Sequence, residues 1–266
     1  MTSPWREVGD RVWVRRYEAL DQTIGVIGSE VGLAVIDTRA SHRRADELRD
    51  ELRLLPGTVV AVVNTHGHWD HVFGNARFGD SPIYGHLRCS AMITEHGEEQ
   101  RARLIEQYPP EIAEQFREVE LVPPDVLIED SATVELGDRQ ILLRHLGRGH
   151  TDNDIIVSVP DASVLFAGDL LENAPAPGFG DSYPIAWAET GRLLLDLVDG
   201  TVVPGHGDPF DHAFAARQVA ELGALAELAR DAVAGSIGLD EALSRSPFPP
   251  DATSEALERA RIELTE

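Results

Sequence analysis

A histidine-rich segment that follows a fully apolar strand constrains the fold more than any other part of the sequence. Residues 58–64 read TVVAVVN and carry no charged side chain, as expected for a strand that is buried on both faces. Residues 65–71 follow directly and read THGHWDH. The side chains in this segment that can bind a metal are His66, His68, Asp70 and His71. Because ligand sites form at the ends of buried strands, we expect this loop to lie at the edge of a sheet and to bind a ligand there.

Three further polar residues stand at the ends of other apolar strands. His150 lies in GRGHTDND after ILLRHL, Asp169 lies in AGDLL after SVLFA, and His206 lies in PGHGD after TVV. Together with the first segment they make five histidines and two aspartates, which are ligand types that catalytic zinc takes. A carboxylate can bridge two ions, and two ions can deprotonate a bridging water and stabilise an oxyanion. The set predicts two zinc ions, with iron or manganese as alternatives, and hydrolysis without a protein nucleophile.

The charge of the chain excludes several classes of partner. Its 266 residues hold 23 Lys+Arg against 46 Asp+Glu, a net charge of −23. Such a surface repels nucleic-acid phosphates and anionic lipid, so we expect no nucleic-acid or membrane partner and a small-molecule substrate. Neither a signal segment nor a membrane span is read from the sequence, and a cytoplasmic location is the expectation. The single cysteine, Cys89, excludes an intrachain disulfide.

Apolar runs separated by Gly, Pro and Ser predict many strands with helices between them. The predicted strands are residues 11–15, 23–28, 33–37, 58–64, 126–128, 132–136, 140–146, 155–159, 163–167 and 201–203. The predicted helices are residues 43–54, 188–197 and the region from about 211 onward. A helical stretch over 87–119 is expected to be interrupted at Gly97 and at Pro109-Pro110. An apolar stripe in the C-terminal region is expected to pack on a sheet, and it consists of Val219, Leu222, Leu225, Ala229 and Val233.

The motifs THGHWDH, GRGHTDND, AGDLL and PGHG, in this order and at strand exits, resemble the metallo-β-lactamase superfamily over about residues 8–209. The resemblance implies an α+β (α/β) fold, a four-layer αββα sandwich of two mixed sheets with the metals in a cleft at one edge. We expect residues 1–210 to form the metal-binding domain, with a helical insertion at about 87–119. Residues 211–266 are expected to be C-terminal helices packed on the same domain.

The resemblance also implies a role for each ligand. The first metal would be held by His66, His68 and His150, and the second by Asp70, His71 and His206, with Asp169 bridging the two. Asp70 is expected to be catalytic as well. Class B1 lactamases carry a cysteine where Asp169 stands, and the only cysteine here lies elsewhere. The Asp-bridged pattern looks like that of hydrolases acting on thioesters, lactones, phosphodiesters and esters.

The interpretation is therefore a dinuclear zinc hydrolase that uses a metal-bridging hydroxide on an ester, thioester, lactone or amide-type bond. Two alternatives remain. One is a mononuclear non-haem iron oxygenase, similar to the persulfide dioxygenases of the same superfamily, because two histidines and a carboxylate suffice for iron. The other is a metal-binding protein without turnover.

A substrate cleft is expected between the insertion at 87–119 and the loop at 173–187. Aromatic side chains predicted to line its pocket are Trp69, Phe73, Phe179, Tyr183 and Trp187. Candidates for positions next to the ligands are His86, Asp154 and Asp208. Asp154 is expected to orient a liganding histidine by bonding the ring nitrogen of that histidine that does not face the metal. The histidines interpreted as non-ligands are His42, His96, His145 and His212.

Overall fold

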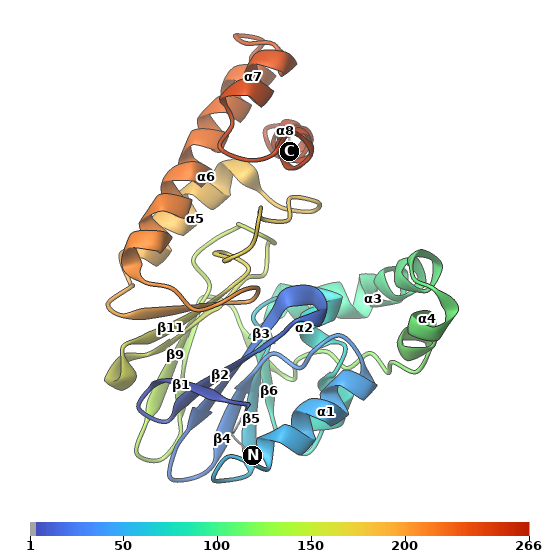
Figure 1. Cartoon of the computed structure of the whole chain (residues 1–266), viewed down its shortest axis with the longest axis vertical. Coiled ribbons are helices and arrows are strands. Elements are labelled where there is room, and N and C mark those ends of the chain that lie inside the picture. The colour runs from blue at the N-terminus through green and yellow to red at the C-terminus, as the bar shows by residue number, and fades with distance from the viewer. Residues whose placement is uncertain (1–3, 266) are drawn as a thin grey trace.

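The central strands of this chain bury side chains on both faces, so each sheet needs a cover on either side. The computed structural model, which describes residues 4–265, provides it with two sheets packed face to face and helices on both outer faces (Figure 1). This arrangement confirms the expected sandwich of two mixed sheets.

The first sheet holds the strands of the N-terminal half in chain order. Its strands are β1 (Arg6–Gly9), β2 (Val12–Tyr17), β3 (Gln22–Gly28), β4 (Leu33–Ile36), β5 (Val59–Val63), β6 (Ile83–His86) and β7 (Val126–Ile128). Strands β1 to β4 are antiparallel, and β4 to β7 run parallel to one another. Parallel neighbours need crossover connections, and helices supply them.

The second sheet follows in sequence and has the order β12-β11-β10-β9-β8. Its strands are β8 (Ser131–Glu135), β9 (Gln140–Arg144), β10 (Ile156–Val159), β11 (Val164–Gly168) and β12 (Thr201–Pro204). Only the β11–β12 pair is parallel. The helices of the chain are α1 (His42–Leu52), α2 (Trp69–Val72), α3 (Leu87–Gln107), α4 (Pro110–Arg117), α5 (Pro184–Leu195), α6 (His212–Val233), α7 (Leu239–Arg245) and α8 (Pro250–Glu263).

Apolar side chains fill the space between the two sheets. Ile36 and Val63 of the first sheet share one buried cluster with Val157 and Phe166 of the second. The outer face of the first sheet is covered by α1, whose Leu48 belongs to the cluster on that side. Helices α5 and α6 cover the outer face of the second sheet. Burial on both faces therefore holds the strand ends in fixed positions.

Helix α3 runs without a break from Leu87 to Gln107, so the expected interruption at Gly97 is wrong. Gly97 is buried, and a Cβ there would lie 3.0 Å from Leu121. The glycine serves close packing of the helix against the segment around Leu121, and this contact outweighs the low helix propensity of glycine. The break at Pro109-Pro110 is confirmed, because α4 begins there.

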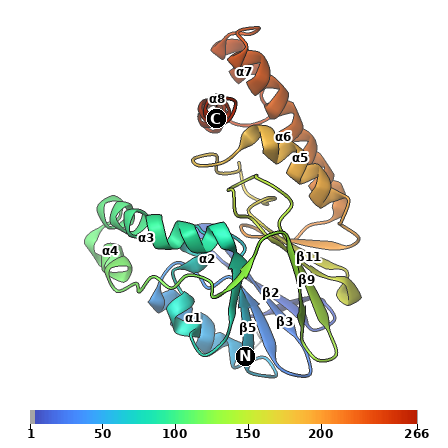
Figure 2. The same cartoon turned by 180° about the vertical axis from the view of Figure 1, so that it is seen from behind.

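Helix α6 extends beyond the sheet that it covers. Val219, Leu222 and Leu225 pack on the second sheet as expected, whereas Ala229 packs among the C-terminal helices. Val233 is 38% exposed, so its assignment to the sheet-facing stripe is wrong. Figure 2 shows α6 leading away from the sheets toward α7 and α8. The division of the chain at residue 210 stays a prediction.

Within residues 4–265, no helix is both long enough and apolar enough to cross a membrane.

Candidate metal centre

The ends of several strands meet at one edge of the sandwich and carry the predicted ligands. Strand β5 leads into residues 64–68 and then α2, β11 leads into Asp169, and β12 leads into His206. His150 lies between β9 and β10. The two sheets are tied together here, because Thr23 of β3 donates its backbone N–H to the carbonyl of Gly205 at 2.7 Å. The tie lies beside His206, where ligands from both sheets come together.

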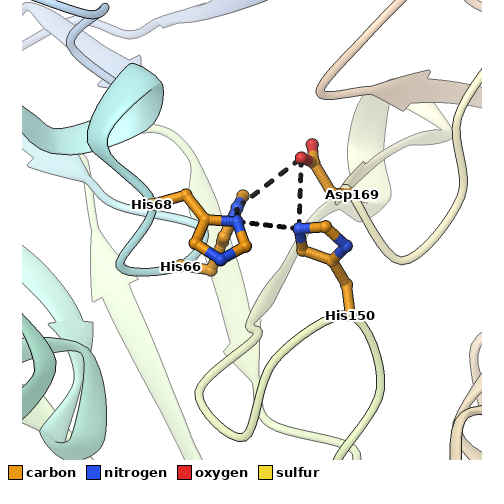
Figure 3. Close-up of side chains that lie close together, drawn as sticks. All are labelled: His66, His68, His150 and Asp169. Carbon is orange, nitrogen blue, oxygen red and sulfur yellow. Dashed lines mark hydrogen bonds and ion pairs between the residues drawn. The ribbon is translucent and has the colours of Figure 1, made fainter. Parts of the chain in front are cut away.

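Four of the predicted ligands converge on one point. Figure 3 shows His66, His68, His150 and Asp169 turned toward one another. The Nδ1 atom of His68 lies 3.0 Å from Nε2 of His66 and 2.9 Å from Nε2 of His150. Asp169 Oδ2 lies 3.6 Å from His66 Nε2 and 3.5 Å from His150 Nε2.

A second group consists of Asp70, His71 and His206. Asp70 Oδ2 lies 3.4 Å from His71 Nε2 and 3.2 Å from His206 Nε2, and the two Nε2 atoms are 3.3 Å apart. Asp169 Oδ2 is 3.4 Å from both of these nitrogens. A single oxygen of Asp169 therefore faces both groups, which is the position a bridging ligand needs.

These separations match the geometry of a small divalent cation. Four ligand atoms placed tetrahedrally at about 2.1 Å from an ion lie about 3.4 Å from one another. The distances within the two groups run from 2.9 to 3.6 Å. The seven side chains are thus spaced as two adjoining ligand sets, without rearrangement of the backbone.

The hydrogen bonds around the histidines turn lone pairs toward the centre. Each of four rings has an acceptor at its outward nitrogen. The pairs are His66 Nδ1 with Thr65 Oγ1, His68 Nε2 with Asp181, His71 Nδ1 with Asp37, and His206 Nδ1 with the carbonyl of Leu20. A neutral imidazole that donates outward presents a bare lone pair inward. Inward lone pairs that lie next to one another and to carboxylates repel unless a cation lies between them. The nitrogen and oxygen donors of the two groups are the ligand types that a divalent cation takes.

Asp37 orients two of these rings at once. Its Oδ2 atom accepts from His71 Nδ1 at 2.8 Å and from the Thr65 hydroxyl at 2.8 Å. Because the Thr65 proton goes to Asp37, the Thr65 oxygen is free to accept from His66 Nδ1 at 3.1 Å. One buried carboxylate therefore sets the tautomer of one histidine in each group.

The buried carboxylates of the centre favour positive charge beside them, as the shifted pKa values of their neighbours show. Burial opposes protonation of His206, but the carboxylates of Asp169 and Asp70 outweigh it and raise the pKa of His206 to about 12. Burial favours the neutral form of Asp169, but His71 and His206 outweigh it and hold the pKa of Asp169 well below its usual range. Burial lowers the pKa of His150 to about 4, so this imidazole stays neutral as a ligand must.

Side chains from three elements hold the backbone of the loop at 65–71. Asn153 accepts the N–H of Gly67 through Oδ1 at 2.8 Å. Gln100 of α3 accepts the N–H of Trp69 at 3.1 Å and donates to the carbonyl of Gly67 at 3.3 Å. Gln22 of β3 donates to the carbonyl of Asp70. The loop geometry is therefore imposed from outside the loop.

The structure corrects three predictions for residues next to the ligands. His86 caps α3 by accepting the N–H of Arg88, and its other ring nitrogen bonds the carbonyl of Glu129, so it serves the helix. Asp154 accepts the N–H and the hydroxyl of Thr151 and shapes the loop after His150, without bonding a ligand ring.

Asp208 pairs with Arg6 and Arg16 at the surface and does not approach the ligands. Four histidines are interpreted as non-ligands, and they are His42, His96, His145 and His212. Among the described residues, none of the four belongs to either ligand group.

The predicted aromatic pocket is mostly core. Phe179 and Trp187 are fully buried in the cluster beneath the second sheet, and Phe73 is buried against α3. Trp187 still supports the centre, because its ring centroid lies 5.6 Å from that of His150. Tyr183 precedes α5 and lies under the guanidinium groups of two arginines. Among these five aromatic residues, Trp69 is the one that lines a cavity beside the metal centre.

Two cavities adjoin the centre. The larger, of about 520 Å³, lies along α3 and is lined by Trp69, Met92 and Leu104 among others. The smaller, of about 450 Å³, contains Asp169 and His206 and is bordered by the loop that includes residues 174–181. Three residues line both cavities, and they are His68, Gly180 and Asp181. The cleft thus lies between the insertion and the 173–187 loop, as expected.

Two residues of the site were missed from the sequence. Asp37 ends the apolar run LAVID, and this is the same signal that identified Asp169 after SVLFA. Asp181, which bonds His68 Nε2 at 2.9 Å, lies inside a loop and follows no strand, so no pattern in the sequence marked it.

Known proteins resemble this chain in sequence. The sequence pattern of the Metallo-beta-lactamase superfamily matches residues 18–206. The human acyl-coenzyme A thioesterase MBLAC2 is 29% identical over 168 residues, which cover 56% of this chain and 56% of that protein. The metallo-beta-lactamase type 2 of Bacillus sp. (strain 170) is 23% identical over 213 residues, which cover 76% of this chain and 75% of that protein. The match thus spans little more than half the length of the thioesterase.

Solved structures share the fold. A metallo-beta-lactamase from Pontibacter korlensis superposes with a TM-score of 0.65 at 20% identity, covering 82% of this chain and 98% of that chain. The sec-alkylsulfatase Pisa1 from Pseudomonas sp. superposes with a TM-score of 0.77 at 19% identity, covering 97% of this chain and 50% of that chain. The likeness to the sulfatase includes most of the C-terminal helices.

Proposed function

Because the chain belongs to the metallo-beta-lactamase superfamily, we propose that it is a hydrolase that uses two zinc ions to cleave an ester, thioester, lactone or amide-type bond of a small molecule. Relatives named as a thioesterase and as β-lactamases support a hydrolase of carbonyl compounds. The observation that carries the proposal is the position of Asp169, one oxygen of which lies 3.4 to 3.6 Å from the four nitrogens of His66, His71, His150 and His206.

When bound, two divalent ions lower the pKa of water and stabilise the oxyanion that forms on a carbonyl. The residues of the chain supply the rest. Asp37, Thr65 and Asp181 hold the imidazoles in the tautomer that a ligand needs. Asp70 belongs to the second group and also lines the larger cavity, so its carboxylate borders both the metal centre and the substrate, which is where a catalytic residue has to lie.

The two cavities fit the two halves of a cleavable molecule. They meet at His68, Gly180 and Asp181, beside the first ligand group. A bond that lies at this junction has one arm in the cavity along α3 and the other in the cavity beside His206. The substrate is thereby held with its reacting bond over the centre, which is the positioning that hydrolysis needs.

The test is metal analysis combined with a substrate panel. We expect about two zinc ions per chain after saturation and dialysis, with hydrolysis of at least one member of a panel of esters, thioesters, lactones and β-lactams. Activity should vanish with a chelator and return with zinc. A saturated protein that holds only one ion would contradict the dinuclear form.

The iron oxygenase alternative leaves His68 and His71 without a metal role. Both rings point into the ligand groups, and this supports the dinuclear proposal over the mononuclear one. Iron analysis of protein from iron-supplied cells and oxygen uptake on a persulfide test the alternative directly. A protein that binds both ions and turns over no member of the panel would instead be a metal-binding protein without activity.

A further inference from the structure

The two cavities at the metal centre are lined by many acidic side chains and a single strongly basic one. The acidic residues that line them are Asp21, Glu99, Glu172 and Asp181, besides the predicted metal ligands Asp70 and Asp169. The basic residue is Arg103, in the cavity along α3. All 23 basic residues of the chain are arginines, so no lysine is available to bind an anionic group of a substrate.

Arg103 is already paired. Its Nη2 atom lies 2.5 Å from Oε1 of Glu99, one turn earlier on α3. Because Glu99 and Arg103 both line the cavity, the pair adds no net charge to it. An anionic group that enters this cavity would have to displace Glu99 from Arg103 and would meet its carboxylate.

Two arginines that contact other lining residues, Asp21 and Asp181, are also engaged. Arg16 bonds Asp21 and, at 2.7 Å, Asp208. Arg259 donates through Nε to the carbonyl of Ser182 at 3.0 Å. Neither arginine can pair with an anion at the centre without giving up a bond to the protein.

The rest of the cavity along α3 suits an apolar arm. Trp69, Met92 and Leu104 line it, and the Trp69 ring is held by edge-to-face packing on Phe116 at 5.5 Å. An indole face close to carboxylates is a good environment for an alkyl chain that ends in a cation. The net charge of −23 adds a long-range repulsion of anions.

We propose that the substrate carries no anionic group outside its reacting bond, and that the arm lying along α3 is an alkyl chain with a neutral or cationic end. This inference rests on the proposed hydrolase function. It sets the chain apart from hydrolases of phosphate-bearing thioesters and of carboxylate-bearing lactams, because the one arginine that lines the two cavities is paired with Glu99 and a strong bond from arginine to phosphate or carboxylate is missing.

Three 4-nitrophenyl esters of matched length test the proposal on the zinc-loaded protein. Their acyl groups are 5-(trimethylammonio)pentanoyl, its uncharged carbon analogue 6,6-dimethylheptanoyl, and the monoanionic adipoyl half-ester. We expect kcat/KM to fall in the order cationic, neutral, anionic, with about tenfold or more between the extremes at low salt. The difference should shrink as salt is added, because the cavity charges are partly exposed. An anionic ester cleaved as fast as the neutral one overturns the proposal.

Variants of the ion pair on α3 distinguish charge from structure. Glu99→Gln releases Arg103 and should lower the cationic-to-anionic ratio of kcat/KM about threefold, whereas Arg103→Gln should raise it by a similar factor. Glu106→Gln removes the same charge from an exposed position of α3 outside the cavity and should leave the ratio unchanged. Equal effects of Glu99→Gln and Glu106→Gln, or shifts of both cavity variants in one direction, overturn the assignment.

A binding experiment separates this inference from the proposed activity. Calorimetry with hexyltrimethylammonium and with hexanesulfonate should show binding of the cation that weakens in Glu99→Gln. Tighter binding of the sulfonate overturns the charge preference whether or not any ester is cleaved. If the neutral ester is cleaved and no charge preference appears in either assay, the hydrolase proposal stands and this inference fails.

Discussion

Asp37 accepts a hydrogen bond from Nδ1 of His71 at 2.8 Å, from the far side of the ring that faces the second ligand group. Neither residue is exposed, with 2% and 0% of their side-chain surfaces accessible. The bond fixes the ring plane and the tautomer together. Through Thr65 the same carboxylate also reaches His66 of the first group.

Replacement of Asp37 should weaken metal binding without removing a ligand. In Asp37→Asn we expect zinc affinity to fall about 10- to 100-fold, because the amide no longer holds His71 and Thr65 in their donor orientation. Thr65→Val, which interrupts only the path to His66, should have a smaller effect. Competition with a chromophoric chelator measures both, and Asp208→Asn is the surface control. Unchanged affinity in Asp37→Asn would contradict the orienting role.

Removal of the shared carboxylate should halve the metal content. In Asp169→Ala the two ions lose the anion between them, so their repulsion expels one. We expect the remaining ion to stay with His66, His68 and His150, because three histidines suffice for zinc. Metal analysis after dialysis gives the stoichiometry. Two tightly held ions in this variant would show that Asp169 is not the bridge.

The loop that carries the first ligands should depend on Asn153 for its stability. Asn153→Ala leaves the buried N–H of Gly67 without its acceptor at 2.8 Å, which costs about 1–3 kcal/mol in the free energy of unfolding. Asn173→Ala, which removes a bond to the carbonyl of Asp208 in an exposed position, should cost less than about 0.5 kcal/mol. Urea denaturation compares the two variants. Equal losses would contradict the role given to Asn153.

Trp187 should matter for stability before it matters for substrate. It is fully buried, and its Nε1 atom donates to the carbonyl of Leu170 at 3.0 Å. Trp187→Phe should lose about 1 kcal/mol from the missing bond, and Trp187→Ala about 3–5 kcal/mol from the cavity. If Trp187 were a substrate contact, Trp187→Phe would raise KM without a change in the unfolding free energy.

His86 should make the protein less stable in weak acid. Burial, followed by the charges of His145 and Arg88, lowers the pKa of His86 from 6.5 to about 4. Between these values the unfolded chain binds more protons than the folded one, so stability falls as the pH drops from 6.5 toward 4. The loss at pH 5 relative to pH 7 should be about 1 kcal/mol smaller in His86→Asn, which keeps a helix-capping side chain. Urea titrations of the chelator-treated protein at the two pH values measure it, and parallel profiles would contradict the assignment.

The seven ligand candidates follow from local patterns, and the fold class follows from the family resemblance that these motifs carry. Buried strands are continuous apolar runs, and a ligand at the end of such a run, as at His66 or Asp169, is read without knowing which strands are neighbours. The same reading missed Asp37 only because one aspartate after a strand is a weak signal by itself. The spacing of apolar residues, and the position of a polar residue after an apolar run, can both be seen in the sequence alone.

The tertiary structure decided which residues contact one another, which line a cavity and which charges lie close together. Gly97 looks like a helix breaker until Leu121 packs against it, and Phe179 looks like a pocket residue until the second sheet covers it. Asp181 reaches His68 across 113 positions of sequence, a contact that no periodicity encodes. Such pairings depend on how layers dock, because burial acts on surfaces that form only after the elements have assembled. The sequence determined which side chains end each strand, and the packing of the layers decided what those side chains face.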